Sequence, residues 1–208
     1  MKGLLKKDIL LLKAQGKTSL FVIAAGVFFC VMNSSAAGMG YMSILCCIIA
    51  LGTLSYDEYD HGYAFLFTLP FTRKDYVLEK YLFGGICLLI GLLLGGIISF
   101  VAGKITGQLI DFAEWIFIPV ALAVIGALFL SVMFPLRLKF DNEHGRIISG
   151  IVLGLIFATC ILLTNLIPEA NLASLSPTAI VLIAIALVIA IVSASIAMSI
   201  KIIKNKEL

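Results

Sequence analysis

The chain has 208 residues, of which 62% are hydrophobic and 13% are charged, with a mean hydropathy of +1.14. A soluble domain of this size carries about 25% charged residues, so the composition excludes an ordinary soluble enzyme and indicates a polytopic membrane protein. A net charge of +3 does not predict a nucleic-acid partner, because the charges cluster between apolar runs. We expect an all-α membrane protein with one transmembrane domain over residues 1–208, embedded in a lipid bilayer.

Residues 3–15 predict an amphipathic helix, with leucine and isoleucine on one face and lysine on the other. Lysines on the polar face suit anionic headgroups, so we expect an interfacial helix on the cytoplasmic membrane surface. A signal peptide is the alternative, but the basic region is long and itself amphipathic.

Six apolar stretches then approach the length of about 20 residues that crosses a hydrocarbon core roughly 30 Å thick. Lys17 can lengthen the first and shortest stretch toward the interface by snorkelling. We predict six transmembrane helices at about 18–33, 38–56, 81–103, 115–136, 147–167 and 178–200.

The basic residues predict the orientation. If the N-terminus is cytoplasmic, every lysine and arginine except Lys104 falls in a cytoplasmic segment. The positive-inside rule then places both termini in the cytoplasm.

The sequence lacks the residues that several kinds of transport and catalysis require. No ionisable side chain lies in the middle of a predicted span, which argues against proton relays, ion-coupled carriers and intramembrane metalloproteases. Gly16-Lys17-Thr18 resembles the end of a phosphate-binding loop, but Leu11 stands where that loop needs glycine. We therefore expect no catalytic, cofactor-binding or metal-binding residues here. We interpret all five cysteines as apolar packing residues, namely Cys30, Cys46, Cys47, Cys87 and Cys160.

Small residues recur every four positions in the third and fifth spans, and such faces let helix backbones approach closely in lipid. Packing within one subunit and an interface between subunits both remain open from the sequence. The candidates are Gly91, Gly95, Ser99, Gly103, Gly150 and Gly154.

The longest polar interruption, residues 57–80, lies between the second and third spans and is called the polar segment here. Pro70 disfavours helical geometry in the residue before it. Thr72 with Asp75 matches a capping box, and Phe71 with Tyr76 matches a hydrophobic staple. We predict a short helix that begins with the acids from Asp57 onward, a proline break and a capped restart into the third span.

An apolar cluster inside this polar segment is typical of a binding surface or of insertion into the membrane interface. An ordinary connecting loop is the alternative. Glu58 and Arg73 are expected to be solvated when no partner is bound. The candidate contact residues are Asp57, Glu58, Tyr59, Asp60, His61, Gly62, Tyr63, Phe65, Leu66, Arg73 and Lys74. A second cytoplasmic connection, 135–146, is expected to be a solvated loop.

The order of residues in these two connections resembles the short ABC-2 type permease subunits of bacterial ABC exporters, such as phenol-soluble modulin and antimicrobial-peptide exporters. The first connection contributes Asp57-Glu58, Gly62, Leu69-Pro70, Thr72-Arg73-Lys74 and Lys80-Tyr81. The second contributes Pro135-Leu136, Lys139-Phe140, Glu143 and Gly145-Arg146.

The resemblance implies a type V-like exporter fold in the bacterial plasma membrane. Two six-helix subunits, identical or homologous, would each dock on a separate ATPase subunit that binds ATP and Mg²⁺. The polar segment would hold the coupling helix that enters a groove of the ATPase, and an amphipathic peptide or lipid-like substrate would move outward. A pathway without charges also suits such cargo better than ions. A non-transporting membrane scaffold and an ATP-independent carrier or flippase are the alternatives.

Overall fold

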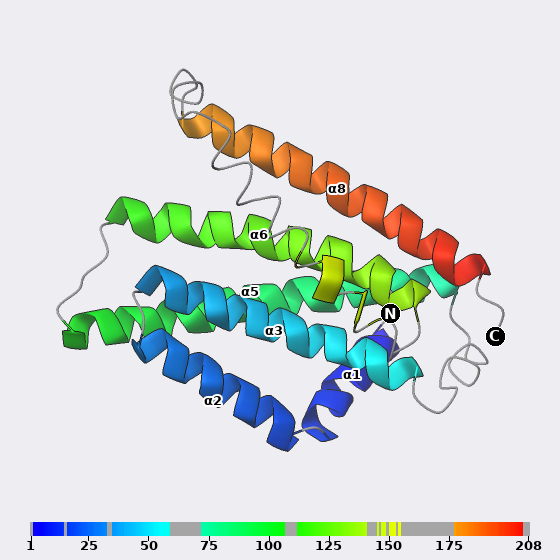
Figure 1. Cartoon of the computed structure of the whole chain (residues 1–208), viewed down its shortest axis with the longest axis horizontal. Coiled ribbons are helices and arrows are strands. Elements are labelled where there is room, and N and C mark those ends of the chain that lie inside the picture. Colours follow the sequence, from blue (N-terminus) through cyan, green and yellow to red (C-terminus); the bar gives the residue numbers. More distant parts are fainter. Residues whose placement is uncertain are drawn as a thin grey trace.

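The computed structural model describes residues 2–14, 16–32, 35–58, 72–106, 112–140, 145, 147–148, 150–152, 154 and 177–205. The helices in these ranges that Figure 1 labels form a bundle, with the short α1 lying across one end. Their bounds are α1 Lys2–Ala14, α2 Gly16–Met32, α3 Ser35–Glu58, α5 Arg73–Thr106, α6 Phe112–Lys139 and α8 Pro177–Asn205.

Four of the described helices are long and apolar enough to cross a membrane: α3, α5, α6 and α8. They coincide with the predicted second, third, fourth and sixth spans. The first predicted span lies on α2, whose apolar stretch, Leu20–Met32, is shorter. The all-helical membrane architecture is therefore confirmed.

Helices α3 and α5 pack antiparallel at backbone distance because glycines line the contact. A Cβ added at Gly91 would lie 2.8 Å from the Cα of Ser43, and one added at Gly95 would lie 3.0 Å from the Cα of Met39. Any side chain at these two positions would push α5 away from α3.

Helices α6 and α8 run parallel, since Ser131 meets Ser195 and Lys139 lies near Lys201 at their C-terminal ends. Parallel helices that follow each other need a return connection, and the sequence places its fifth span, 147–167, there. Most of that stretch lies outside the described residues, so the count of six spans stays a prediction.

The capped restart after the proline is confirmed. The backbone N–H of Thr72 donates to the Asp75 carboxylate at 3.1 Å, and the backbone N–H of Asp75 donates to the Thr72 hydroxyl at 3.2 Å. From this cap α5 continues without a break for 34 residues, about 51 Å at 1.5 Å per residue. Since the hydrocarbon core is roughly 30 Å thick, the first turns of α5 extend beyond it. Phe71, the other half of the predicted staple, lies outside the described residues.

Two predicted boundaries are wrong. Helix α3 continues to Glu58, so Asp57 and Glu58 lie in its last turn rather than at the start of a new helix. Helix α6 continues through Pro135 to Lys139, so the first part of the expected loop 135–146 is helical. In both places contacts with neighbouring helices, given below, outweigh the local signal.

The core lies between α3, α5 and α6, with one residue each from α1 and α8. Four cysteines, Cys30, Cys46, Cys47 and Cys87, are free and buried, which confirms them as packing residues, whereas Cys160 lies outside the described residues. The main cluster consists of Leu4, Cys47, Leu51, Leu54, Tyr76, Val77, Leu88, Leu130, Met133, Phe134, Leu138 and Ile203.

Candidate functional site

Four charged residues from three helices form a buried group, called the ionic cluster here: Lys7, Asp8, Asp57 and Lys80. The Nζ of Lys80 lies 2.5 Å from Asp8 on α1 and 2.8 Å from Asp57 on α3. Lys80 is 1% exposed, Asp8 0% and Asp57 4%. One ammonium group therefore bridges two carboxylates, away from water, and joins α1, α3 and α5.

Further hydrogen bonds surround the ionic cluster, although Asp8 Oδ1 accepts none from the described residues and has only the Lys7 ammonium group 3.4 Å away. Lys7, at the more exposed edge, pairs with Asp57. The Tyr76 hydroxyl donates to Asp57 at 2.9 Å, and Lys80 also donates to the hydroxyl of Thr53 at 3.2 Å. Buried ion pairs offset their desolvation cost only when such additional bonds satisfy the remaining lone pairs. The cluster thus fixes the relative positions of three helices rather than contributing a large net free energy of folding.

The ionic cluster compensates an unfavourable position of Asp57 at the end of α3. A carboxylate in the last turn of a helix faces the negative end of the helix dipole. The two lysine ammonium groups and the Tyr76 hydroxyl compensate that unfavourable placement. The sequence instead predicts that Asp57 begins a short helix of the polar segment. Its burial is not predicted, because neither of its lysine partners is close to it in the sequence.

Asp8 is a further buried acid that is absent from the residues predicted above. The signal was present, since position 8 is one turn from both Leu4 and Leu12 and therefore belongs to the apolar face of α1. Leu4 is buried, and Leu12 packs against a second small core cluster of α3 and α5. A single acid on an apolar face indicates a buried partner, which here is Lys80.

Glu79 differs from Asp8 and Asp57 in its surroundings. Its side chain is fully buried, and neither carboxylate oxygen has a hydrogen-bond partner in the part of the chain that the structure describes. It interacts electrostatically with the ionic cluster. With Glu79, three carboxylates face two ammonium groups, so the region has one acid more than its lysines neutralise.

A second polar group lies on another side of α5 and is called the hydroxyl node here. The Tyr81 hydroxyl lies 2.5 Å from the Ser195 hydroxyl and 3.0 Å from that of Ser199, both on α8. The Ser195 hydroxyl donates to the backbone carbonyl of Ser131 on α6 at 2.5 Å. The ring of Tyr81 packs on Phe134, with ring centroids 4.7 Å apart.

The hydroxyl node explains how α6 continues through a proline. Pro135 has no N–H, so it cannot bond the carbonyl of Ser131 four residues earlier. In a membrane such a freed carbonyl needs another donor, and neighbouring serines commonly supply it. Ser195 does so here.

Two arginines form hydrogen bonds between helices at the same end of the bundle. Arg73 donates to the backbone carbonyls of Ile203 and Lys204 at 2.9 Å each, at the end of α8. Arg137 donates to the hydroxyl of Ser55 on α3, also at 2.9 Å. Arg73, expected to be solvated, is partly exposed, and its guanidinium group also binds the last carbonyls of α8, which lack helical N–H donors.

Only some of the predicted contact residues of the polar segment lie among the described residues. Lys74 is exposed near the start of α5, and Glu58 belongs to the last turn of α3. The other predicted contacts, Tyr59, Asp60, His61, Gly62, Tyr63, Phe65 and Leu66, lie outside the described residues.

The small-residue candidates divide into two groups. Gly91 and Gly95 face α3, and Ser99 and Gly103 are also buried, so the α5 face packs within the chain. Gly150 and Gly154 are exposed, and a Cβ at either would meet no atom of the described residues within 4 Å.

Comparison with known protein families now bears on this arrangement. The family model for the ABC-2 family transporter protein matches residues 3–204, nearly the whole chain. The chain belongs to the ABC-2 transporter family. No curated protein matches the sequence.

As an ABC-2 type permease, the chain is a membrane-integral transporter component of a kind that is typically non-catalytic and that pairs with an ABC ATPase. The polar segment of this permease is thus bounded by described structure on both sides. Its first residue Asp57 and its last residue Lys80 are bound to each other and to α1.

Proposed function

We propose that this permease is the membrane subunit of an exporter in which a separate ATPase binds ATP and Mg²⁺ and drives an amphipathic peptide or lipid-like substrate out of the cell. The ATPase contacts the polar segment, and both chain termini lie on the cytoplasmic side of the plasma membrane. The fold and the family support a permease. The substrate class rests on the absence of charged residues from the middle of the predicted spans.

The ionic cluster is the observation that carries the coupling role. It joins the end of α3 to the start of α5, the two helices between which residues 59–71 run, and it joins both to α1. Displacement of that segment moves the three helices together, because movement of any one helix alone would break at least two ion pairs of the cluster.

Helix α5 supplies the route from the polar segment toward the outer helices. It is continuous from Arg73 to Thr106, so its start and its span move as one body. Lys80 contacts the α1 and α3 side, and the next residue, Tyr81, contacts α8. The Lys80-Tyr81 pair, part of the resemblance described above, thus couples a displacement of α5 to both sides of the bundle.

The coupling role is tested by copurification with the ATPase and by substrate-stimulated ATP hydrolysis. Lys74 is the better contact probe on α5, because replacing Arg73 would also break its bonds to α8. Lys74→Ala and Glu58→Ala are expected to fold normally and to weaken docking or stimulation. Losing one partner of a charge pair at an interface costs about 2–5 kcal/mol if that pair is buried there.

Two exposed lysines give matched controls for this experiment. Lys13→Ala lies on α1 and Lys104→Ala at the end of α5, and both should behave like wild type. If Lys74→Ala and Glu58→Ala also match wild type, the ATPase docks elsewhere. If no ATPase copurifies with wild type, the scaffold alternative gains.

We further propose a second permease subunit, identical or homologous, with the exposed glycines of the fifth predicted span as candidates for the contact. Gly150→Leu should leave the fold intact and reduce the dimer signal in native mass spectrometry of the purified complex. Gly95→Leu should instead lower stability by about 1–3 kcal/mol or more, because it overpacks the contact with α3. A complex with one permease and one ATPase in wild type would contradict the pairing.

A further inference from the structure

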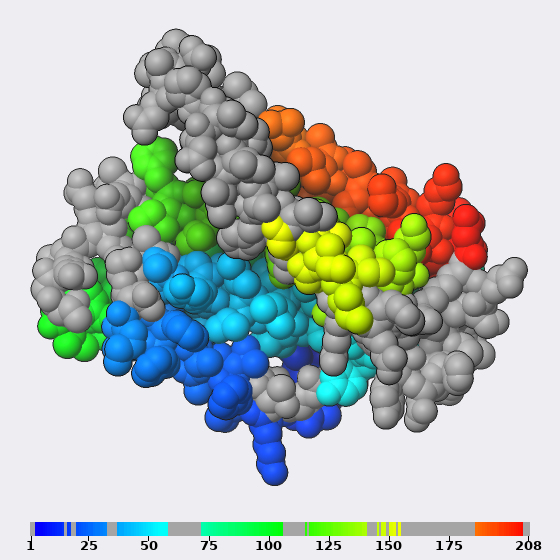
Figure 2. Space-filling view, in the orientation of Figure 1, coloured from blue at the N-terminus to red at the C-terminus, as the bar shows by residue number. Residues whose placement is uncertain are grey.

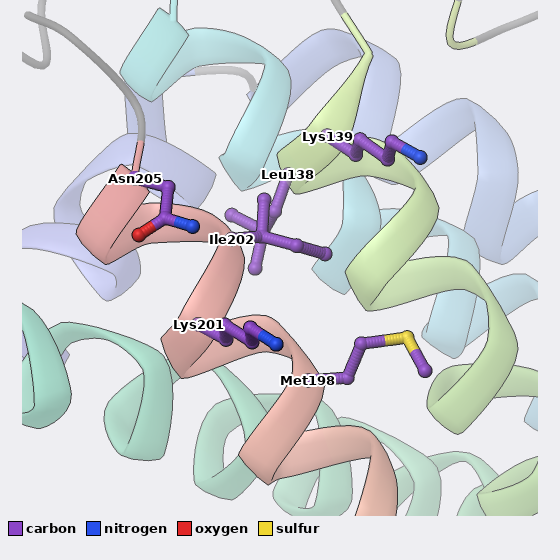
Figure 3. Close-up of a pocket in the computed structure, with 6 residues that line it drawn as sticks. All are labelled: Leu138, Lys139, Met198, Lys201, Ile202 and Asn205. Atoms are coloured by element: carbon purple, nitrogen blue, oxygen red, sulfur yellow. The ribbon is translucent and has the colours of Figure 1, made fainter.

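The C-terminal ends of α6 and α8 enclose a groove, called the cationic groove here, with a volume of about 370 Å³. Two of its lining residues lie at the end of α6, and the other four lie on the last two turns of α8 (Figure 3). They are Leu138, Lys139, Met198, Lys201, Ile202 and Asn205.

The cationic groove is lined by both polar and apolar side chains. Lys139, Lys201 and Asn205 are exposed and supply two ammonium groups and a carboxamide. Leu138, Met198 and Ile202 supply the apolar part, and Met198 is 58% exposed. In the described part of the chain, no carboxylate lines the groove.

An exposed apolar stripe leads into the cationic groove along α8. Leu187, Ile191 and Met198 follow at spacings of four and seven residues, so they share one face with Lys201. Leu187 is 57% exposed and Ile191 is 42% exposed. Figure 2 shows this part of α8, in orange to red, at the outer edge of the molecule.

The position of the cationic groove matches the boundary between hydrocarbon and headgroups. The candidate membrane spans of α6 and α8 end at Lys139 and Asn205. Lysines near the ends of transmembrane helices extend to the interface, so Lys139 and Lys201 place the groove at this depth. Basic pockets between transmembrane helices at this depth bind anionic lipid headgroups.

From this arrangement we propose that the cationic groove is a binding site for an anionic phospholipid. The phosphate lies between the Lys139 and Lys201 ammonium groups, and Asn205 donates to a phosphate or glycerol oxygen. One acyl chain follows the apolar stripe of α8 past Met198 toward Leu187. Charge complementarity distinguishes this site from the general lipid surface, which the exposed apolar residues contact without headgroup preference.

The test is native mass spectrometry of the full-length permease in detergent with added dioleoyl phosphatidylglycerol or dioleoyl phosphatidylcholine. Wild type should retain phosphatidylglycerol at least tenfold better than phosphatidylcholine. The Lys139→Gln, Lys201→Gln double variant should bind phosphatidylglycerol about 30-fold more weakly, because each lysine near an anionic surface contributes roughly fivefold. Lys139 and Lys201 are both exposed, so the double variant is expected to fold.

Further arms separate the headgroup from the chain and from free phosphate. Met198→Ser should weaken binding of phosphatidylglycerol but leave the headgroup preference unchanged. Inorganic phosphate at millimolar concentration should fail to displace the lipid; if it competes fully, the ligand is free phosphate and the proposal is wrong. Lys13→Gln and Lys104→Gln, at exposed lysines outside the groove, should bind like wild type.

Equal retention of the two lipids by wild type, or unchanged phosphatidylglycerol binding by the double variant, would overturn the proposal. Neither result depends on ATPase docking or transport. Failure here would therefore leave the proposed exporter function untouched, and failure of that function would leave the lipid site untouched.

Discussion

The ionic cluster and the hydroxyl node lie on different sides of α5 and are adjacent through Lys80 and Tyr81, yet they hold helices together by different physical means. The ionic cluster uses charges on α1, α3 and α5, whereas the hydroxyl node uses hydroxyl groups and a backbone carbonyl on α5, α6 and α8. Most side chains of both are buried; the ionic cluster includes the last residue of the polar segment, and the hydroxyl node includes the residue that follows it.

The difference follows from what each site has to compensate. The ionic cluster neutralises Asp57, an acid at an unfavourable helix end, and Asp8, an acid on an apolar helix face. The hydroxyl node replaces one backbone hydrogen bond that Pro135 removes. A charge needs an opposite charge and further bonds, but a carbonyl needs only one neutral donor. Removing a member should therefore cost much more in the ionic cluster than in the hydroxyl node.

The largest expected effect is that of Lys80→Met. It keeps most of the side-chain volume but leaves Asp8 without its 2.5 Å partner, so the free energy of unfolding should fall by about 3–5 kcal/mol. Thermal unfolding of the purified permease in detergent measures the change. Lys13→Met, at an exposed position on α1, is the control and should lie within about 0.5 kcal/mol of wild type.

A compensating variant sharpens this prediction. Adding Asp8→Leu to Lys80→Met removes the buried acid that keeps only the more distant Lys7, 3.4 Å away, and should recover much of the loss, because an apolar pair often replaces a buried ion pair without net cost. Asp57 keeps Lys7 and Tyr76 as partners in this double variant. If Lys80→Met unfolds no more readily than Lys13→Met, the two networks do not differ in the way described here.

A smaller effect is expected in the hydroxyl node. Ser195→Ala removes the donor to the Ser131 carbonyl and should lower stability by about 0.6–1.7 kcal/mol, the range for side-chain hydrogen bonds between membrane helices. In a Pro135→Ala background the same change should cost less, because residue 135 then supplies the missing N–H. The coupling between the two changes is the measured quantity.

Ser193→Ala is the matched control for the hydroxyl node. Ser193 is exposed and donates to the carbonyl of Ala190 in its own helix, at 2.8 Å. Its loss should not depend on residue 135. Additive costs for Ser195→Ala and Pro135→Ala would show that Ser195 does not compensate the proline.

The smallest expected effect, and one of opposite sign, is that of Glu79→Gln. This change removes the acid in excess beside the ionic cluster while keeping its shape, so stability should stay equal or rise by up to about 1 kcal/mol. Thermal unfolding again measures it. Thr72→Ala, which removes the N-cap hydroxyl of α5, should instead destabilise by about 0.5–2 kcal/mol. A clear loss for Glu79→Gln would mean that its carboxylate has a partner when the protein is purified.

The sequence by itself determined the class of protein, the four long spans among the described residues, and the capped start of α5. These depend on local quantities: hydropathy summed over about 20 residues, and hydrogen bonds between residues three apart. The small-residue face of α5 was also visible, because its period of four is a property of one helix. That its glycines contact α3 was left open, since the partner of a helix face is not encoded in its spacing.

Only the tertiary structure decided which charged side chains are buried and with which partners they pair. Asp8 and Lys80 are 72 positions apart, and Ser131 and Ser195 are 64 apart. Composition and charge counts treated Lys7, Lys80 and Arg73 alike, as cytoplasmic surface charges. Folding separates them, because a buried charge is tolerated only where distant helices bring its partner within hydrogen-bonding distance. The same physics explains why Asp57 lies inside the bundle and why α6 continues through its proline.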